Sequence, residues 1–195
     1  MEKAAVLILL LAGASALAPT AKLTNPSKAC PFMECPPKLD GTMVGDMGFD
    51  PMGISNTLPD LRYARAAELK HGRIAQLAVV GFLWQEKLPH LGGVPGYEEI
   101  NPLAAPSSVP FAANVQIFLA IAIAEFIMEC VPGGAYGTGE PGDFGFGASF
   151  LKGKSDAQVT DLKLKEIVHG RLAMWAIAGM VTQTLCFGVG GSTII

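Results

Sequence analysis

Glutamate, histidine and arginine recur in the same order at two places in this sequence. The first is Glu-Leu-Lys-His-Gly-Arg at residues 68–73 and the second is Glu-Ile-Val-His-Gly-Arg at residues 166–171. On a helix the Glu and His lie about 60° apart on one face, and the Arg lies about 140° from the Glu. A carboxylate and an imidazole both carry lone pairs, and a guanidinium neutralises a carboxylate. The pattern therefore places a carboxylate and an imidazole on one face of each of two helices.

Each arginine is poorly placed to serve the glutamate of its own helix. Both motifs lead into apolar segments, where ionisable groups are costly and need partners. We therefore expect Glu68 to pair with Arg171, and Glu166 to pair with Arg73. The remaining carboxylate and imidazole lone pairs then point outward, which implies a ligand that accepts them. The alternative is a salt-bridged helix pair with two satisfied histidines.

The repeat extends beyond the two motifs. Aligned without gaps, the copies share alanines and glycines as far as Gln85 and Gln183. A loop recurs as well, because Gly-Asp-Met-Gly-Phe-Asp-Pro-Met-Gly at residues 45–53 has a degraded copy at residues 142–150. Each loop precedes its helix at nearly the same distance, so the repeated unit is a loop plus a helix. Pro51 and the glycines give the first loop a shaped, extended course.

Three features together resemble the light-harvesting chlorophyll-binding protein superfamily. They are the doubled Glu-x-x-His-Gly-Arg, the apolar helix after each copy, and Gly-Phe-Asp-Pro-Met-Gly at residues 48–53. The histidine in both copies and Cys-Pro-Pro-Lys-Leu-Asp-Gly at residues 35–41 are most similar to the fucoxanthin chlorophyll a/c-binding branch of red-lineage algae. The resemblance covers residues 31–187. It implies an antenna protein that binds chlorophyll a, chlorophyll c and fucoxanthin or a related xanthophyll. The partners it implies are a photosystem I or II core, neighbouring antenna proteins and thylakoid lipids.

The composition agrees with a membrane protein and excludes other classes. Half of the 195 residues are hydrophobic, 16% are charged and the mean hydropathy is +0.39. A net charge of -3 is too mild for a nucleic-acid-binding protein. The sequence shows no nucleophile with a base, no phosphate loop and no metal cluster, so no enzyme is expected. The four cysteines do not form a credible disulfide framework and are read as free thiols.

Two targeting segments are expected at the N-terminus. Residues 1–16 combine a lysine, a short apolar run and Ala-Ser-Ala at 14–16, which is typical of a signal peptide. Residues 17–30 are free of acids and carry hydroxyl side chains, as in a plastid transit segment. Together they resemble the address of plastids bounded by extra membranes, although Leu17 stands where the family usually has Phe. The expected location is the plastid thylakoid membrane, with the pigment-binding domain at residues 31–195.

We predict an all-α, multi-pass membrane protein with three transmembrane helices, at about 59–88, 111–131 and 160–187. The first and third helices carry the repeat and run in the same direction, as a pseudo-two-fold crossed pair. Small side chains on facing stripes permit a close crossing. The stripes are Gly72, Ala75, Ala78 and Gly81, and Gly170, Ala173, Ala176 and Gly179. Basic residues gather on the motif side, which the positive-inside bias assigns, with the N-terminus, to the stroma.

The family resemblance implies roles for individual residues. Chlorophyll Mg takes one axial ligand, which an oxygen or an imidazole supplies. The expected central ligands are the repeated carboxylates and imidazoles, Glu68, His71, Glu166 and His169. Arg73 and Arg171 are the expected counter-charges of the glutamates. Gln183 lies about 40° round the stripe of His169 and ~21 Å deeper, and the same position carries a chlorophyll in family members.

Other candidates lie outside the central set. Gln116 and Glu125 are in the second helix, where the family often holds peripheral chlorophylls. Glu129 is expected to be a solvated residue at the end of that helix. Gln76 is either a ligand or a helix-to-helix hydrogen bond. Asp50-Pro51 belongs to the loop that packs on one end of a carotenoid in the family.

Two other functions fit parts of the pattern. A photoprotective, quenching relative uses the same scaffold. A small transporter would also show internal symmetry and ion pairs in the membrane. Its helices would be broken by Gly and Pro near the midplane, however, and the two motif helices contain no Pro.

Overall fold

A computed structural model describes residues 25–87, 98–130, 134 and 139–187. Within these ranges the regular structure is helical, and the one strand-like feature is an isolated bridge between Pro26 and Glu34. The chain forms two compact units, with the boundary along the sequence between Thr57 and Leu58, and each unit is described by itself. Residues 1–24, with the expected signal peptide and part of the expected transit segment, lie outside the described residues.

The first unit is a loop held by backbone and hydroxyl hydrogen bonds, with one short helix, α2 (Ile54–Thr57). Ser27 is only 3% exposed, and its hydroxyl donates to the Met47 carbonyl at 3.1 Å. The backbone N–H of Cys35 donates to the carbonyl of Asn25 at 2.8 Å. Gly48 has φ +67°, and a Cβ there would lie 2.7 Å from the Cys35 Sγ. The loop therefore needs glycine at this position both for its backbone conformation and for space.

Two of the long helices begin after proline. Helix α3 (Leu61–Lys87) follows Pro59, and the Asp60 carboxylate accepts the N–H of Arg62 at 2.9 Å, which satisfies one free N–H of the first turn. Helix α5 (Phe111–Cys130) follows Pro110. These ranges lie within the spans of 59–88 and 111–131 expected from the sequence. A short helix, α4 (Ala105–Ser108), precedes α5.

The third long helix begins earlier than expected. Helix α7 runs over Asp156–Phe187, whereas the sequence placed its start near 160. The side chain of Gln158 accepts the backbone N–H of Ser155 at 3.1 Å, and Asp156 lies in the first turn. A Ser followed three residues later by Gln is a capping box, and an acid in the first turn complements the helix dipole. The short helix α6 (Ala148–Leu151) lies before this cap.

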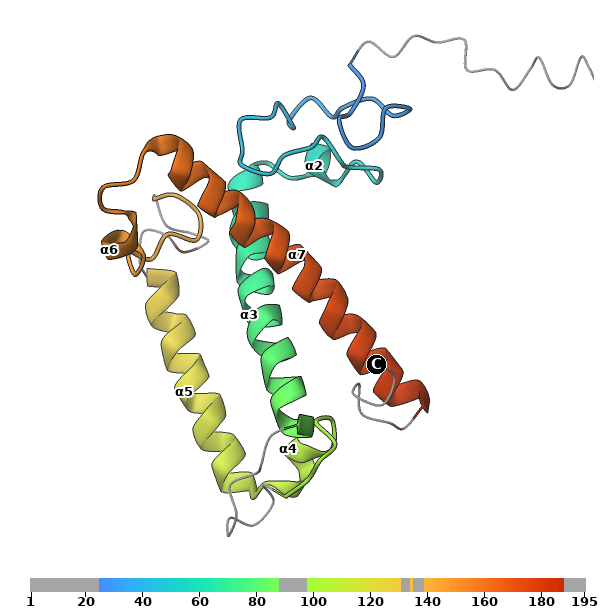
Figure 1. Cartoon of the computed structure of the whole chain (residues 1–195), viewed down its shortest axis with the longest axis vertical. Helices are drawn as coiled ribbons and strands as arrows, with labels where there is room; N and C mark the ends of the chain where they lie inside the picture. Colours follow the sequence, from blue (N-terminus) through green and yellow to red (C-terminus); the bar gives the residue numbers. More distant parts are fainter. Residues whose placement is uncertain (1–24, 88–97, 131–133, 135–138, 188–195) are drawn as a thin grey trace, which may run out of the picture. The chain divides into compact units, whose positions relative to one another are not determined.

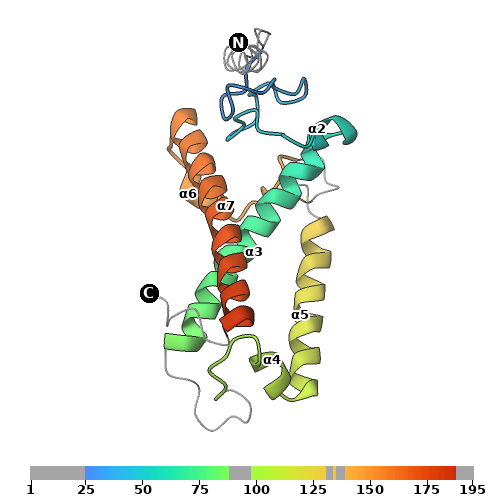
Figure 2. The ribbon, with the colours of Figure 1, turned by 90° about the vertical axis from the view of Figure 1, so that its right-hand side faces the viewer.

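Helices α3 and α7 cross and run in the same direction, and α5 runs the opposite way (Figures 1 and 2). At the crossing, a Cβ on Gly72 would lie 3.0 Å from the Gly170 Cα. Ala75 and Ala173, one turn further on, are also buried. The expected stripe of small residues does not continue, because Gly81 and Gly179 are exposed with nothing within 4 Å of an added Cβ. The two helices diverge from a single close point.

Among the described helices, only α5 is by itself long and apolar enough to cross a membrane. It has 20 residues and a mean hydropathy of 1.9, and none of its residues is buried. Helices α3 and α7 have 27 and 32 residues, which is enough length for a ~30 Å core. Both helices carry charged residues in their first part, however, so a continuous uncharged stretch begins only after Arg73 in α3 and after Arg171 in α7. Length and composition thus give one candidate span, where the sequence predicted three.

Candidate functional site

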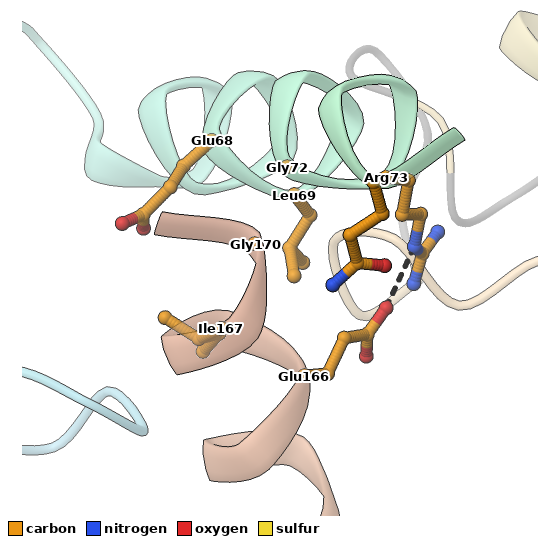
Figure 3. Close-up of a pocket in the computed structure, with 8 residues that line it drawn as sticks. Glu68, Leu69, Gly72, Arg73, Glu166, Ile167 and Gly170 are labelled. Carbon is orange, nitrogen blue, oxygen red and sulfur yellow. Dashed lines mark hydrogen bonds and ion pairs between the residues drawn. The ribbon is translucent and has the colours of Figure 1, made fainter. Parts of the chain in front are cut away.

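Two ion pairs link α3 and α7 in the crossed arrangement predicted from the sequence. Arg73 Nε lies 2.7 Å from Glu166 Oε1, and Arg171 Nε lies 2.7 Å from Glu68 Oε1. Figure 3 shows Arg73 and Glu166 facing each other on one side of the Gly72 crossing, with Glu68 on the other side. The prediction of crossed pairing is therefore confirmed. Each motif glutamate thus receives a cation from the opposite helix.

The two carboxylates differ in how many cations hold them. Glu68 Oε2 also accepts Arg65 at 2.9 Å, so both oxygens of Glu68 contact a guanidinium. The repeat partner of Arg65 is Lys163, which instead binds Glu140 at 2.6 Å. Among the described residues, Glu166 is therefore contacted by one cation, through Oε1. Its second oxygen has no contact with a described side chain.

Both histidines are oriented alike. Nδ1 of His71 lies 2.7 Å from the carbonyl of Ala67, and Nδ1 of His169 lies 2.7 Å from the carbonyl of Lys165. A carbonyl only accepts, so Nδ1 carries the proton in both rings, and Nε2 of each neutral imidazole keeps its lone pair. Both side chains are exposed. The alternative of satisfied structural histidines leaves these two Nε2 atoms unused.

A small pocket lies at the crossing between the two glutamates. Its lining comes from both helices and consists of Glu68, Leu69, Gly72, Arg73, Gln76, Glu166, Ile167 and Gly170. The alternative in which Gln76 forms a helix-to-helix hydrogen bond is not seen, since no described residue hydrogen-bonds its amide. The amide is therefore available to a ligand at the pocket.

The loop before α7 covers one of the two arginines. The guanidinium carbon of Arg73 lies 5.6 Å from the centre of the Phe144 ring, within the range of a cation–π contact. Gly142, with φ +80°, lies against α3, since a Cβ on it would meet Leu69 Cδ1 at 2.7 Å. This segment was recognised in the sequence only as a degraded loop copy. Its contact with Arg73 was not predicted.

The two loop copies have the same backbone turn. Gly48 N–H donates to Asp46 Oδ1 at 2.8 Å, and Gly145 N–H donates to Asp143 Oδ1 at 3.0 Å. The glycine of each pair has φ between +67° and +79°. An aspartate that accepts from the N–H two residues later is a typical turn. The two loops therefore share this turn in their structure as well as in their sequence.

Asp50 of the first loop holds the start of α2. Its carboxylate accepts the N–H groups of Ile54 at 3.0 Å and Ser55 at 2.8 Å. The Ser55 hydroxyl beside this carboxylate, together with these N–H groups, keeps the pKa of Asp50 below its ordinary value. The buried hydroxyl has no hydrogen bond of good geometry, so the two backbone bonds are the firmer cause. Pro51, the next residue, is exposed.

The other candidates lie apart from the crossing. Gln183 is half-buried near the end of α7, and Gln116 is exposed in the second turn of α5. Glu125 and Glu129 both contact the ammonium of Lys70, at 2.6 and 2.5 Å. The expectation that Glu129 is a solvated residue is therefore wrong, because it is half-buried and ion-paired.

Sequence reasoning missed three contributors, which are Arg65, Lys70 and Phe144. Arg65 precedes Glu68 by three residues, a spacing that brings two side chains together on a helix, so a local signal existed. Lys70 contacts α5 and Phe144 contacts α3, and the sequence did not specify how these elements lie relative to one another.

The donors fit a metal that already has its own ring of ligands. Among the described residues, no three His, Cys, Asp or Glu side chains gather where they could enclose an ion. The exposed Nε2 atoms and the free Glu166 oxygen each offer one axial donor, as chlorophyll Mg requires. Further along the same helices, Leu77, Leu172 and Trp175 are 74%, 67% and 81% exposed. Such apolar surface suits a large apolar ligand or lipid.

Comparison with known proteins agrees with this geometry. The family model described as "Chlorophyll A-B binding protein" matches residues 35–185. The fucoxanthin-chlorophyll a-c binding protein of Chattonella marina var. antiqua is 31% identical, over 96% of this chain and 89% of the relative. Photosystem I chlorophyll a/b-binding protein 5 of Arabidopsis thaliana is 33% identical, over 78% of this chain and 68% of the relative. Light-harvesting complex stress-related protein 1 of Chlamydomonas reinhardtii is 35% identical, over 72% of this chain and 61% of the relative. By these matches, the chain belongs to the chlorophyll a/b-binding protein family.

Proposed function

We propose that this protein is a light-harvesting antenna that binds chlorophylls and carotenoids and passes absorbed energy to a photosystem. The observation that carries the proposal is the pair of repeat-equivalent histidines, each with Nδ1 bonded to a carbonyl and Nε2 left exposed. They stand beside two carboxylates whose charges are balanced from the opposite helix. The pigments, when bound, absorb light and exchange excitation energy. The chain fixes their positions and performs no covalent chemistry.

The central axial ligands in this proposal are Glu68, His71, Glu166 and His169. Arg73 and Arg171 balance the charge of each carboxylate and orient it. Gln183 serves a pigment deeper along α7, and its half-buried amide has no hydrogen bond to a described residue.

Four further positions complete the proposed set. Gln76 offers its amide at the crossing pocket. Gln116 and Glu125 serve peripheral chlorophylls on α5, most of whose side chains are exposed. Asp50-Pro51 forms the turn against which one end of a carotenoid packs. The similarity to a fucoxanthin-chlorophyll a-c binding protein supports chlorophyll a, chlorophyll c and fucoxanthin or a related xanthophyll as the pigments.

We further propose that α3, α5 and α7 all span the thylakoid membrane, with the N-terminus in the stroma. The direction of the three helices supports this, since α3 and α7 run against α5 (Figure 1). Basic residues gather around the crossing end of α3 and α7, on the side expected for the stroma. Photosystem cores, neighbouring antenna proteins and thylakoid lipids would then meet the exposed apolar faces.

An absorption spectrum of the purified protein tests the proposal directly. The expected result is the combined bands of chlorophyll a, chlorophyll c and a xanthophyll. A folded but colourless protein would exclude the antenna function. Chlorophyll b bands in place of chlorophyll c would correct the pigment class and leave the antenna function standing.

A second candidate function is photoprotective quenching of absorbed energy. The observation that favours it is the 35% identity to a light-harvesting complex stress-related protein, which is higher than the 31% to the fucoxanthin protein. Chlorophyll fluorescence lifetime of the isolated protein separates the two functions. A long lifetime at every pH supports harvesting, and a lifetime that shortens in acid supports quenching.

A further inference from the structure

Lys70 joins α3 to α5 through two carboxylates. Its ammonium lies 2.6 Å from Glu125 Oε2 and 2.5 Å from Glu129 Oε1. The two glutamates are four residues apart on α5, so they share one face of that helix. They are also the only charged residues of α5. Both charged side chains of this apolar helix therefore contact one lysine of α3.

This contact breaks the symmetry of the repeat. Val168 occupies the position of Lys70 in the second copy, and it is 51% exposed. Lys70 points away from the crossing, since it lies about 160° round α3 from Gly72. The lysine is thus present only in the copy that faces α5, the helix without a repeat partner. A general role in the repeated unit would not account for that difference.

The two glutamates are not equivalent in this cluster. Glu125 uses Oε2 to contact Lys70, and its Oε1 has no contact with another described residue. Its side chain is 45% exposed, compared with 31% for Glu129. Among the described residues, one oxygen of Glu125 therefore stays without a hydrogen bond or ion pair, and Glu129 is the less exposed member of the cluster.

We infer that Lys70 is the positioning residue of the peripheral pigment on Glu125, an inference that rests on the proposed pigment-binding function. It fixes the carboxylate through one oxygen and leaves the other for an axial bond to Mg. Arg73 does the same for Glu166 between α3 and α7, where it contacts one of the two carboxylate oxygens. Without Lys70, the described residues offer Glu125 no cation, and the carboxylates of Glu125 and Glu129 share one face of α5. The rotamer of Glu125 would then no longer be fixed for an axial bond to Mg.

The test is reconstitution of the full-length chain with pigments, followed by chlorophyll counting and circular dichroism in the red absorption region. Lys70→Met is expected to lose the same chlorophyll as Glu125→Gln, with matching difference spectra and the central pigments retained. Lys70→Arg is expected to restore that chlorophyll. Lys165→Met is the matched control, since it removes a lysine from an ion pair with Asp161 within α7. It should keep the full complement.

A double variant separates positioning from charge balance. Lys70→Met with Glu129→Gln leaves Glu125 as the one carboxylate, so the net charge of the cluster is unchanged, and it also serves if Lys70→Met alone fails to refold. Loss of the Glu125 chlorophyll from the double variant supports the inference. A full complement in Lys70→Met or in the double variant overturns it. If Glu125→Gln loses no chlorophyll while wild type is fully pigmented, the inference fails but the antenna function stands. Colourless wild type would instead remove the antenna function itself.

Discussion

Gly72 of α3 and Gly170 of α7 meet backbone to backbone, with 3.0 Å between the Gly170 Cα and the position of a Cβ on Gly72. The two residues are repeat equivalents, and the crossed ion pairs lie beside them. No flexible side chain stands between the helices at this point, so neither helix can yield without a backbone shift. The glycine pair therefore sets how closely the two carboxylate–guanidinium pairs approach.

Replacing Gly72 by Val should destabilise the folded protein by about 1–3 kcal/mol through overpacking. The matched variant is Gly81→Val on the same helix, where nothing lies within 4 Å of the added Cβ. That change should be nearly neutral, because Val is a slightly better helix former than Gly. Thermal unfolding followed by far-UV circular dichroism measures both. Equal shifts of the two midpoints would contradict the close crossing.

Removing Arg73 should do more damage than removing Arg171. Arg73→Leu leaves Glu166 without a cation among the described residues, whereas Arg171→Leu leaves Glu68 with Arg65 at 2.9 Å. Both pairs are partly exposed, so we expect a loss of about 1 kcal/mol for Arg73→Leu, at the upper end of the range for exposed pairs. A loss of roughly 0.5 kcal/mol or less is expected for Arg171→Leu, because Arg65 still neutralises Glu68.

The spectral signature of these variants should appear on the opposite helix. Reconstituted Arg73→Leu is expected to share its difference spectrum with Glu166→Gln, and Arg171→Leu with Glu68→Gln. Removing Arg65 together with Arg171 should raise the loss to that of Arg73→Leu. A spectrum of Arg171→Leu that matches Glu166→Gln would show that each arginine serves its own helix.

Substitutions of His71 should distinguish its two ring nitrogens. The amide end of Gln reaches about as far as Nε2, and the amide end of Asn only as far as Nδ1, which faces the Ala67 carbonyl. His71→Gln is therefore expected to retain its chlorophyll and His71→Asn to lose it, with the same pattern at His169. Counting chlorophylls per reconstituted chain checks this. Equal retention in both variants would mean that the exposed nitrogen holds no pigment.

Asp50→Ala should expose the amides of Ile54 and Ser55 to hydrogen exchange. Loss of a helix-capping acceptor costs about 0.5–2 kcal/mol, or roughly a 2- to 30-fold faster exchange. The pKa of Asp50 is lowered in the fold, so its stabilisation is fully present above the unfolded value of about 3.9 and is lost as pH falls through the folded value. Asp60→Ala is the control, since it removes only the acceptor of Arg62 N–H. A flat pH profile for wild type would exclude this role for Asp50.

The mature chain should begin before Asn25. The sequence assigned residues 17–30 to the transit segment, yet Asn25, Ser27 and Ala29 hydrogen-bond to Cys35 and Met47 in the loop unit. Cleavage at residue 30 would remove all three of these bonds. N-terminal sequencing of the protein isolated from thylakoids decides between the two starts. A first residue at or after 30 would show that the loop forms without them.

The crossed pairs could be predicted because helical geometry alone excludes the partner on the same helix. An arginine about 140° from its glutamate needs a second helix, and the repeat supplies one with the same offset. The start of α7 was missed for a local reason, since Ser155 and Gln158 form a capping box that an apolar pattern does not reveal. The small-residue stripe was extended too far, because two straight helices that cross at Gly72 must separate within a few turns.

The partners of Lys70 could not be predicted in the same way. Their meeting depends on which side of α3 the non-repeated helix occupies, and the connecting segments carry no periodic signal that fixes it. Phe144 presents the same difficulty, since a loop residue finds Arg73 only once the loop has a course in space. Local spacing therefore predicts the motifs, and the packing order of the helices decides which additional charges join them.

The crossed ion pairs have the form of an isologous interface, in which one residue contacts a second and the repeat equivalents make the same contact in return. Two copies of a single motif helix, related by a two-fold axis through the glycine crossing, would satisfy both pairs without any change of sequence. The α5 cluster lies outside that symmetry, since Lys70 has a valine for its counterpart, and so does Arg65, whose counterpart Lys163 binds Glu140 instead of Glu166. The two motif helices can thus be viewed as an internal homodimer whose subunits are distinguished by a few charged side chains outside the crossed pairs.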